Sequence, residues 1–406
     1  MLKRNLHSIC IFLLFVILLA CQQTEKQHKV IENKETELSE RIQETIAPIE
    51  KRSPAISIVT ESRSNYKFQY STSVRHTIGE FVDAPMTEVT PKNIRHENHV
   101  SSKIKTTNTE LTEMEVFPLM VNIIFDNDIF NNTDYYYTNG ARIEMVLPIA
   151  KSSPVNKMLL GLKTNDIDIS GFSITQNIYT PINPEATGIE YGDRPFASYL
   201  TVGQFRESYH LKKKIQIKSA LDIGVIGPLA FGEKVQSTVH TLEPTGWKYQ
   251  LQNSFLINYY FRIEKGLYGS SNFELNAVGQ ANLGTLYDKI GGGLRWRAGS
   301  FLPVYRGPMT ICCNQAKRRQ LQYWFFMTAN TDLVVYDATL QGSMFDNNSP
   351  YVLENSDINR VVFTGSMGVA LYYDNLGVEL ENIYLTPEFK GAKYFGYGRI
   401  KLVANF

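Results

Sequence analysis

The chain has 406 residues, a formal net charge of +1 and a mean hydropathy of −0.21, so bulk charge gives no reason to expect nucleic-acid binding. Beyond the first 20 residues, no segment reaches the ~20 apolar residues that a membrane-spanning helix needs. This composition is compatible with a membrane β-barrel, because barrel strands carry apolar residues only at every second position.

The segment 1–20 has the pattern of a bacterial signal peptide. Lys3 and Arg4 precede an apolar run that is too short to span a membrane. The run ends in Leu-Leu-Ala before Cys21. This ending resembles a lipobox, which implies cleavage before Cys21 and lipidation of its thiol. Gln rather than Asp follows at 22–23, so by resemblance to lipoprotein sorting signals we expect an outer-membrane location with a lipid-anchored N-terminus. An ordinary signal peptide with a chance cysteine is the alternative.

Residues 21–115 are predicted to form a polar, largely disordered tether. They contain few aromatic residues and many Glu, Lys, Thr and Ser, so they offer little to bury. The part 32–49 suits one helix. The tether would space the lipid anchor from the domain at 116–406, and a small folded domain is the alternative.

From residue 116 the pattern changes to strands with period-two alternation. Ile143 and Met145 face one way, whereas Arg142 and Glu144 face the other. An apolar face opposite a charged face suits a wall between lipid and a polar interior. The same alternation recurs at 215–225 and 394–406.

The fold class is therefore predicted to be all-β, a twelve-stranded antiparallel transmembrane barrel with strands of roughly ten residues or more. An even count returns both barrel ends to the periplasmic side. The terminal Phe406, with aromatic residues upstream, resembles the C-terminal signature of outer-membrane barrels. A water-soluble sandwich or closed soluble barrel is the alternative. The predicted strands are 117–128, 136–149, 168–180, 196–208, 212–226, 252–264, 270–283, 286–299, 320–335, 360–374, 377–387 and 393–406.

One short helix is predicted, over 230–242, on the extracellular side. Glu233, Gln236 and His240 stand at i, i+3 and i+7, so an acid, an amide and an imidazole share one helix face. A polar ridge on the only helix of a β protein is a candidate for chemistry. A surface histidine, or a satisfied core histidine, is the more common explanation of such a residue.

Strand parity places the concentrated polar motifs on one rim. If the first strand runs outward, the connections after strands 1, 3, 5 and 9 lie outside. They hold the acidic segment 126–128, the segment 193–195, the helix with His240, and Asp337 with 346–348. Random placement would divide these motifs between the two rims, so this rim is predicted to carry the site.

Four segments, in order, resemble those of the LpxR-type lipid A 3′-O-deacylases. They are Phe-Asp-Asn-Asp-Ile-Phe at 125–130, Thr-Asp-Tyr-Tyr-Tyr-Thr-Asn-Gly at 133–140, Asp-Arg-Pro-Phe-Ala at 193–197, and the helix segment 227–251. Each segment alone is a weak signal, whereas four in order are a strong one. The resemblance covers roughly 117–406. The lipobox and the tether lie outside it.

The resemblance implies a twelve-stranded outer-membrane barrel that uses Ca²⁺ to hydrolyse the acyloxyacyl ester at the 3′ position of lipid A, the membrane anchor of lipopolysaccharide. Asp126 stands where the family motif usually has Glu, which keeps the charge. Carried across, the functional positions fall on Asn127, Asp128, Thr138, Gln236 and His240.

The residue chemistry agrees with this activity. His240 is the candidate base for an activated water. Ca²⁺ prefers hard oxygen ligands, which Asp128, Asp126 and backbone carbonyls can supply. Asn127 would donate to the oxyanion, and Gln236 would orient His240 or the water. The aspartates are otherwise turn formers, and Thr138 is otherwise part of a strand-entry turn. Ideal alternation sends Asn127 and Asp128 to opposite faces, so one site needs an irregular strand end.

Three basic residues on the same rim, Arg194, Lys234 and Lys248, are candidate contacts for an anionic glycolipid. An Arg194–Asp193 structural pair and a solvated rim explain them equally well. Trp247 is expected to be an interfacial aromatic. A monomer is expected. The rival functions are an outer-membrane phospholipase and a non-enzymatic barrel, either a porin or a binding protein.

Overall fold

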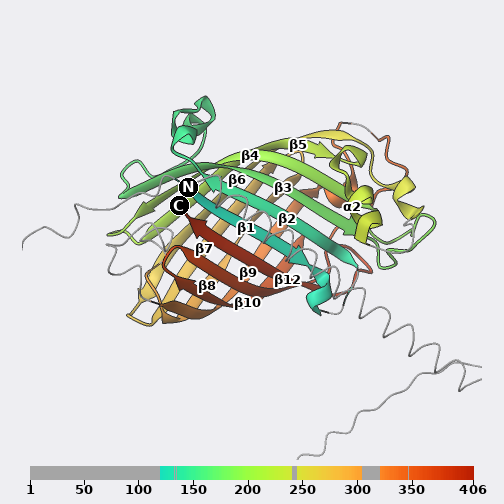
Figure 1. Cartoon of the computed structure of the whole chain (residues 1–406). Helices are drawn as coiled ribbons and strands as arrows, with labels where there is room; N and C mark the ends of the chain where they lie inside the picture. The colour runs from blue at the N-terminus through green and yellow to red at the C-terminus, as the bar shows by residue number, and fades with distance from the viewer. Residues whose placement is uncertain (1–118, 132, 134, 240–244, 304–320, 346) are drawn as a thin grey trace, which may run out of the picture. The chain divides into compact units, whose positions relative to one another are not determined.

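The computed structural model describes residues 119–131, 133, 135–239, 245–303, 321–345 and 347–406. Twelve antiparallel strands close into a barrel in which β1 pairs with both β2 and β12 (Figure 1). This confirms the predicted fold class. The predicted signal peptide, the tether and Cys21 lie outside the described residues. The strands are β1 (Met120–Asn127), β2 (Tyr136–Val146), β3 (Ile167–Thr180), β4 (Ala197–His210), β5 (Ile215–Ile226), β6 (Ser254–Gly269), β7 (Phe273–Gly284), β8 (Tyr287–Ser300), β9 (Gln322–Asp337), β10 (Val361–Tyr373), β11 (Leu376–Leu385) and β12 (Phe395–Asn405).

The alternation predicted from the sequence separates the lumen from the outer wall. On β2, Arg142 and Glu144 line the lumen, whereas Ile143 between them is 42% exposed on the outside. On β5, Lys218 and Asp222 line the lumen and Ile223 faces outward. The apolar outer surface is what a barrel wall in lipid requires.

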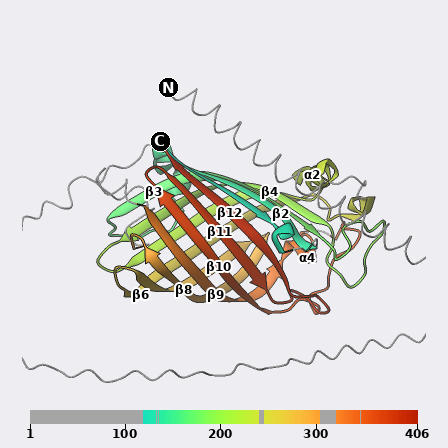
Figure 2. The ribbon, with the colours of Figure 1, turned by 60° about the horizontal axis from the view of Figure 1, so that its bottom comes forward.

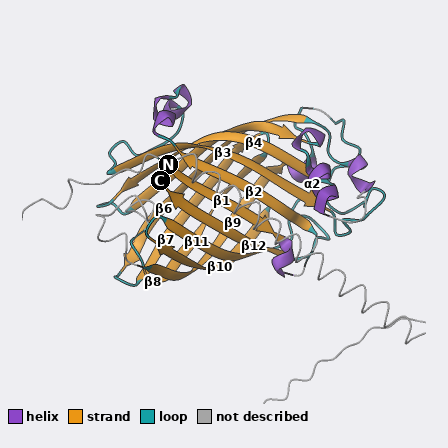
Figure 3. Cartoon of the chain, viewed as in Figure 1, coloured by secondary structure: helices purple, strands orange, loops and turns teal. Residues whose placement is uncertain are grey.

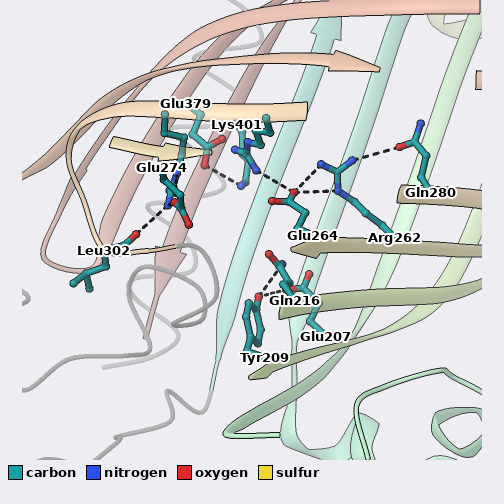
Figure 4. A network of polar contacts seen from close by, with 12 residues as sticks. Glu207, Tyr209, Gln216, Arg262, Glu264, Glu274, Gln280, Leu302, Glu379 and Lys401 are labelled. Atoms are coloured by element: carbon teal, nitrogen blue, oxygen red, sulfur yellow. Dashed lines mark hydrogen bonds and ion pairs between the residues drawn. The ribbon is translucent and has the colours of Figure 1, made fainter. Parts of the chain in front are cut away.

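The lumen is a cavity of about 720 Å³ filled with paired charges. Eight acidic and eight basic side chains line it, so it carries no net formal charge. Arg262 donates to Glu264 at 2.7 Å, and Lys401 donates to Glu379 at 3.0 Å (Figure 4). Arg297 also pairs with Glu274 in the same network. These pairs occupy the interior with side chains that hold one another in place.

A connection between β2 and β3 folds back over the outer wall. It contains two 3₁₀-helices, η3 (Pro148–Ser152) and η4 (Pro154–Lys157), which project from the side of the barrel in Figure 1. Beneath it, the wall is polar: Arg206 pairs with Asp168 at 2.9 Å and donates to the Leu159 carbonyl at 3.3 Å. The outer side of the connection is apolar, since Ile149, Met158 and Leu160 are 71%, 63% and 56% exposed. The connection therefore replaces a polar stretch of wall by an apolar surface.

Substituting Asp168→Ala is expected to destabilise the barrel by about 1–3 kcal/mol, because Arg206 loses its charged partner under the covering loop. Ser208 also loses its acceptor, since it donates to the same carboxylate at 2.8 Å. Urea unfolding of the protein in detergent micelles measures the change. The control is Lys151→Ala, an exposed residue of the same loop, which should shift stability by less than about 0.5 kcal/mol. Equal stability of the two variants would contradict this role of the ion pair.

The rim opposite the C-terminus carries further helices (Figures 1 and 3). The connection after β5 forms η5 (Pro228–Ala230), α2 (Gly232–Val239) and η6 (Thr245–Tyr249), and the connection after β9 forms the single turn α4 (Ala338–Gln341). None of the described helices is long and apolar enough to cross a membrane. We call this rim the α2 rim. The connections after β1, β3, β5 and β9 all lie here, as strand parity predicts.

Candidate functional site

Two short helices stand on the outer wall at the α2 rim. The 3₁₀-helix η2 (Asp128–Asn131) follows β1, and α2 follows β5. In Figure 2 both lie at the same end of the barrel. The outward faces of β1, β2 and β3 therefore lie between η2, which begins with Asp128, and the polar face of α2.

Glycines let η2 lie flat on β12. A Cβ at Gly398 would come within 2.6 Å of the Phe130 Cβ, and one at Gly396 within 2.7 Å of the Asn131 Nδ2. The closeness of these contacts means that a larger side chain at either position would lift η2 from the wall. The position of Asp128, the first residue of η2, thus depends on a wall without side chains.

α2 is held on β3 and β4 in a similar way. Val235 packs on a buried outward cluster that includes Ile178, Phe196 and Trp247. The Gly232 N–H donates to the Ser198 Oγ at 3.2 Å, which ties the start of the helix to β4. Trp247 is fully buried, so the expectation that it is an interfacial aromatic is wrong.

Gln236 faces the wall. It is buried, whereas Glu233, Lys234 and Ser237 around it are exposed. The predicted base, His240, lies outside the described residues. The described helix α2 ends one residue before it, at Val239. The predicted i, i+3, i+7 ridge is therefore described only at Glu233 and Gln236, and Glu233 accepts a hydrogen bond from Gln250 at 3.4 Å.

Between the two helices, β2 contributes Thr138 through a β-bulge. The pairing of β2 with β3 shifts between Tyr137 and Asn139, which leaves Thr138 as the extra residue. Its hydroxyl lies 2.7 Å from that of Thr180 on the outward face of β3. Tyr136, two residues before, has a φ of 68°, in the left-handed region that non-glycine residues rarely adopt. Bulges and such outliers concentrate near functional sites.

Asn127 and Asp128 both reach this region because the strand ends between them. Asn127 is the last residue of β1 and lies opposite Asn139 of β2, with its side chain on the face opposite to that of Asp126. Asp128 begins η2 and no longer follows strand alternation. The irregular strand end that one shared site needs is present. The Asp128 Oδ2 accepts the Tyr135 N–H at 2.9 Å.

Asp126 points into the lumen instead. Its carboxylate accepts from the Arg399 guanidinium at 2.7 and 2.8 Å and from the Tyr137 hydroxyl at 3.0 Å. The wall of β1 thus separates Asp126 from the outward side of the site. Metal binding by Asp126 stays a prediction, but this bidentate pair already occupies its oxygens.

Arg194 is not a surface residue. Its guanidinium is fully buried, donates to Glu388 at 3.2 Å and to the Thr339 hydroxyl at 2.9 Å, and stacks 4.4 Å above the Tyr179 ring. Burial raises the pKa of the Glu388 carboxyl, and the positive charge of Arg194 offsets part of that rise. Contact of Arg194 with a substrate phosphate stays a prediction, but its guanidinium is already occupied by Glu388 and Thr339. The alternative, a structural ion pair, agrees better with these contacts, except that the partner of Arg194 is Glu388 rather than Asp193.

Lys234 and Lys248 are exposed on the α2 rim. The Lys248 amine lies 4.8 Å from the centroid of the Tyr249 ring. Both amines are placed where an anionic headgroup outside the barrel could meet them, and their role in substrate binding stays a prediction.

A calcium ion held in this region would meet few charges and mostly neutral oxygens. Among the described residues, no three His, Cys, Asp or Glu side chains gather into a metal cluster. The Asp128 carboxylate is buried, and it follows Asn127, which pairs with Asn139 of β2, the residue after Thr138. Calcium accepts such mixed oxygen sets, and fewer carboxylates give weaker binding. The residues fit a low-affinity calcium site.

These features define an outer-membrane type of β-barrel with a polar site on the outer wall rather than in a pore. The family model described as outer membrane protein LpxR matches residues 104–406, and the chain belongs to this family. The barrel is therefore an outer-membrane protein.

A solved structure of this family agrees on the fold. LpxR from Salmonella typhimurium is 21% identical, and the match covers 71% of this chain and 100% of that chain with a TM-score of 0.57. The β domain of the Bordetella autotransporter BrkA also matches, with 7% identity over 72% of this chain and 100% of that chain and a TM-score of 0.38. The translocator domain of NalP from Neisseria meningitidis matches with 9% identity, 73% and 90% coverage and a TM-score of 0.36. No curated protein matches the chain.

Proposed function

We propose that this barrel hydrolyses the 3′-linked acyloxyacyl ester of lipid A in the outer leaflet. The observation that supports the proposal best is the placement of Asn127 and Thr138 on the lipid-facing side of the wall, between Asp128 on η2 and Gln236 on α2. A glycolipid in the membrane can approach this side laterally, without passing through the lumen. Membership of the LpxR family supports the same activity.

In the proposed reaction, His240 takes a proton from a water molecule whose oxygen attacks the ester carbonyl carbon. The Asn127 amide donates to the negative charge that develops on the carbonyl oxygen. Collapse of the tetrahedral intermediate breaks the bond between the acyl carbon and the 3′ oxygen, which receives the proton from His240. The products are a free acyloxyacyl acid and lipid A with a 3′ hydroxyl. Gln236 would orient His240 or the water.

A bound calcium ion would polarise the ester carbonyl. Asp128 would hold it together with neutral oxygens of the same region, which include the Thr138 hydroxyl. Lys234 and Lys248 would meet the phosphates of the glycolipid from the water side of the rim.

Mass spectrometry of lipid A after incubation with the purified barrel tests the proposal. Loss of the 3′ acyloxyacyl group is expected from lipid A, with no release from phosphatidylethanolamine. Release of fatty acid from the phospholipid alone would identify a phospholipase instead. A porin is disfavoured by the charge-paired lumen, in which Arg399 and Asp126 bridge neighbouring strands.

Removal of calcium is expected to stop turnover. Because one buried carboxylate dominates the proposed donor set, we expect activity to rise over roughly millimolar rather than nanomolar calcium. Titration of free Ca²⁺ in the lipid A assay measures this. The variant Asp128→Asn should shift the titration to higher calcium, whereas Lys248→Gln should leave its midpoint in place. Full activity in excess chelator would exclude the ion from the reaction.

A further inference from the structure

An apolar groove opens on the outer wall, on the side of η2 away from the candidate site. It has a volume of about 470 Å³ and lies over β10, β11 and β12 at the α2 rim. Its walls include Phe363, Gly365, Tyr384 and Tyr394. The volume falls within the range of sites that hold a small ligand.

The groove faces the membrane. Phe363, Tyr384 and Tyr394 are 55%, 50% and 73% exposed, and on β10 the next outward residues, Met367 and Val369, continue the apolar wall. A fatty acyl chain that enters the groove from the membrane would therefore pass from one apolar surface to another. This continuity with the lipid-facing wall fits a fatty acyl chain as the occupant.

Polar groups gather at the rim end of the groove. The Asn131 Nδ2, in the last residue of η2, is buried without a hydrogen-bond partner, although the amide oxygen accepts from Asn382 at 2.6 Å. The amine of the exposed Lys393 lies 5.7 Å from the centroid of the Tyr135 ring, which also lines the groove. An anionic lipid has an apolar chain and a charged headgroup. The apolar lining of the groove suits the chain, and the Asn131 amide and the Lys393 amine at its rim end suit the headgroup.

The groove is joined directly to the proposed site. Tyr135 lines the groove and donates its N–H to the Asp128 carboxylate at 2.9 Å. Thr133 also lines it, and its hydroxyl donates to the Asp128 carbonyl at 3.2 Å. A ligand in the groove would therefore lie beside the same short helix that positions Asp128.

We propose that this groove binds one acyl chain of the anionic glycolipid while its ester lies at Asp128. This inference rests on the proposed function for the identity of the lipid. It assigns chain selection to the wall of β10–β12, and it makes Lys393 a headgroup contact that complements the lysines near α2.

Gly365→Phe fills the groove without disturbing the wall, because no heavy atom lies within 4 Å of a Cβ at this position. The matched control is Val369→Phe, which adds bulk to the same face of the same strand outside the groove. Native mass spectrometry of the detergent-solubilised barrel with lipid A measures binding independently of turnover. Gly365→Phe is expected to weaken binding about tenfold, equivalent to about 1.4 kcal/mol, and Val369→Phe is expected to bind like the unchanged protein.

Two further measurements complete the test. Lys393→Gln should weaken binding of lipid A but not of lipid A without phosphates. Phosphatidylethanolamine should bind both phenylalanine variants equally, and an equal loss of both lipids in Gly365→Phe would overturn the assignment to the glycolipid. If Gly365→Phe loses the heat-modifiable mobility of a folded barrel, Gly365→Leu replaces it.

The two proposals fail in different ways. Equal lipid A binding by all three proteins, with 3′ deacylation intact, would overturn the groove and leave the proposed function standing. Weakened binding in Gly365→Phe alone, in a barrel that releases no acyl group, would support the groove and overturn the proposed function.

Discussion

His240→Ala is expected to abolish release of the 3′-linked acyl group while the barrel still assembles. Loss of a positioned general base typically lowers a rate by about 10²–10⁴-fold. The barrel part of the sequence, 116–406, contains two histidines, His210 and His240. His210 ends β4 at the opposite rim, where its Nδ1 lies 3.2 Å from Asp166. The only other imidazole of the barrel is therefore at the far end from Asp128.

The measurement is the rate of acyl release from lipid A, with heat-modifiable migration in gels as the check on folding. His210→Gln is the matched control, since it removes an imidazole from the other end of the barrel and should keep its activity. Wild-type turnover by a folded His240→Ala protein would remove this residue from the mechanism. The proposed base would then have to be sought elsewhere on the rim.

The fold was predictable because the membrane imposes a simple rule on the strands. Lipid outside and charge inside force alternation, so Arg142 and Glu144 were correctly assigned to the side opposite Ile143. The end of β1 was predicted at 128, one residue too late. That residue matters, because the chain changes from strand to 3₁₀-helix at Asp128, so this side chain is released from the alternation that would send it to the face opposite Asn127.

Partners of charged residues could not be predicted in the same way. Alternation does not specify that Asp126 meets Arg399 on β12, 273 positions later, or that Arg194 pairs with Glu388 across the mouth. Both residues stand in segments that resemble the family, so the resemblance favoured functional roles for them. In the folded barrel, the pairing of β1 with β12 sets Asp126 opposite Arg399. Arg194, in the connection between β3 and β4, pairs with Glu388 in the connection between β11 and β12.

Some site residues gave no signal in the sequence. Thr180 is an ordinary strand threonine until the bulge at Thr138 brings the two hydroxyls to 2.7 Å. Likewise, the sequence does not distinguish Gly398 from Gly396, the other glycine of the last strand. The importance of Gly398 comes from η2 lying on it, a contact between chain segments about 270 residues apart.

Gly398→Val is expected to lower the deacylation rate by about tenfold to a hundredfold without preventing barrel assembly. A Cβ at this position would come within 2.6–2.7 Å of the Cβ and ring of Phe130, so η2 must shift away from β12. Asp128 begins η2 and would shift with it. A displacement of about 1 Å at a catalytic group can lower a rate about 10²-fold.

The control must add the same bulk to the wall without touching η2. Gly279→Val does so on β7, where the one heavy atom within 4 Å of the new Cβ is the Ile263 Cγ2 at 3.2 Å, a contact far milder than the 2.6 Å at Gly398. Gly279→Val should therefore keep its rate. Gly398→Val should also need more calcium for half-maximal activity, because the displaced carboxylate is the proposed ligand. A lower rate with an unchanged calcium requirement would show that η2 acts through packing alone. An unchanged rate would show that the packing of η2 on β12 does not affect catalysis.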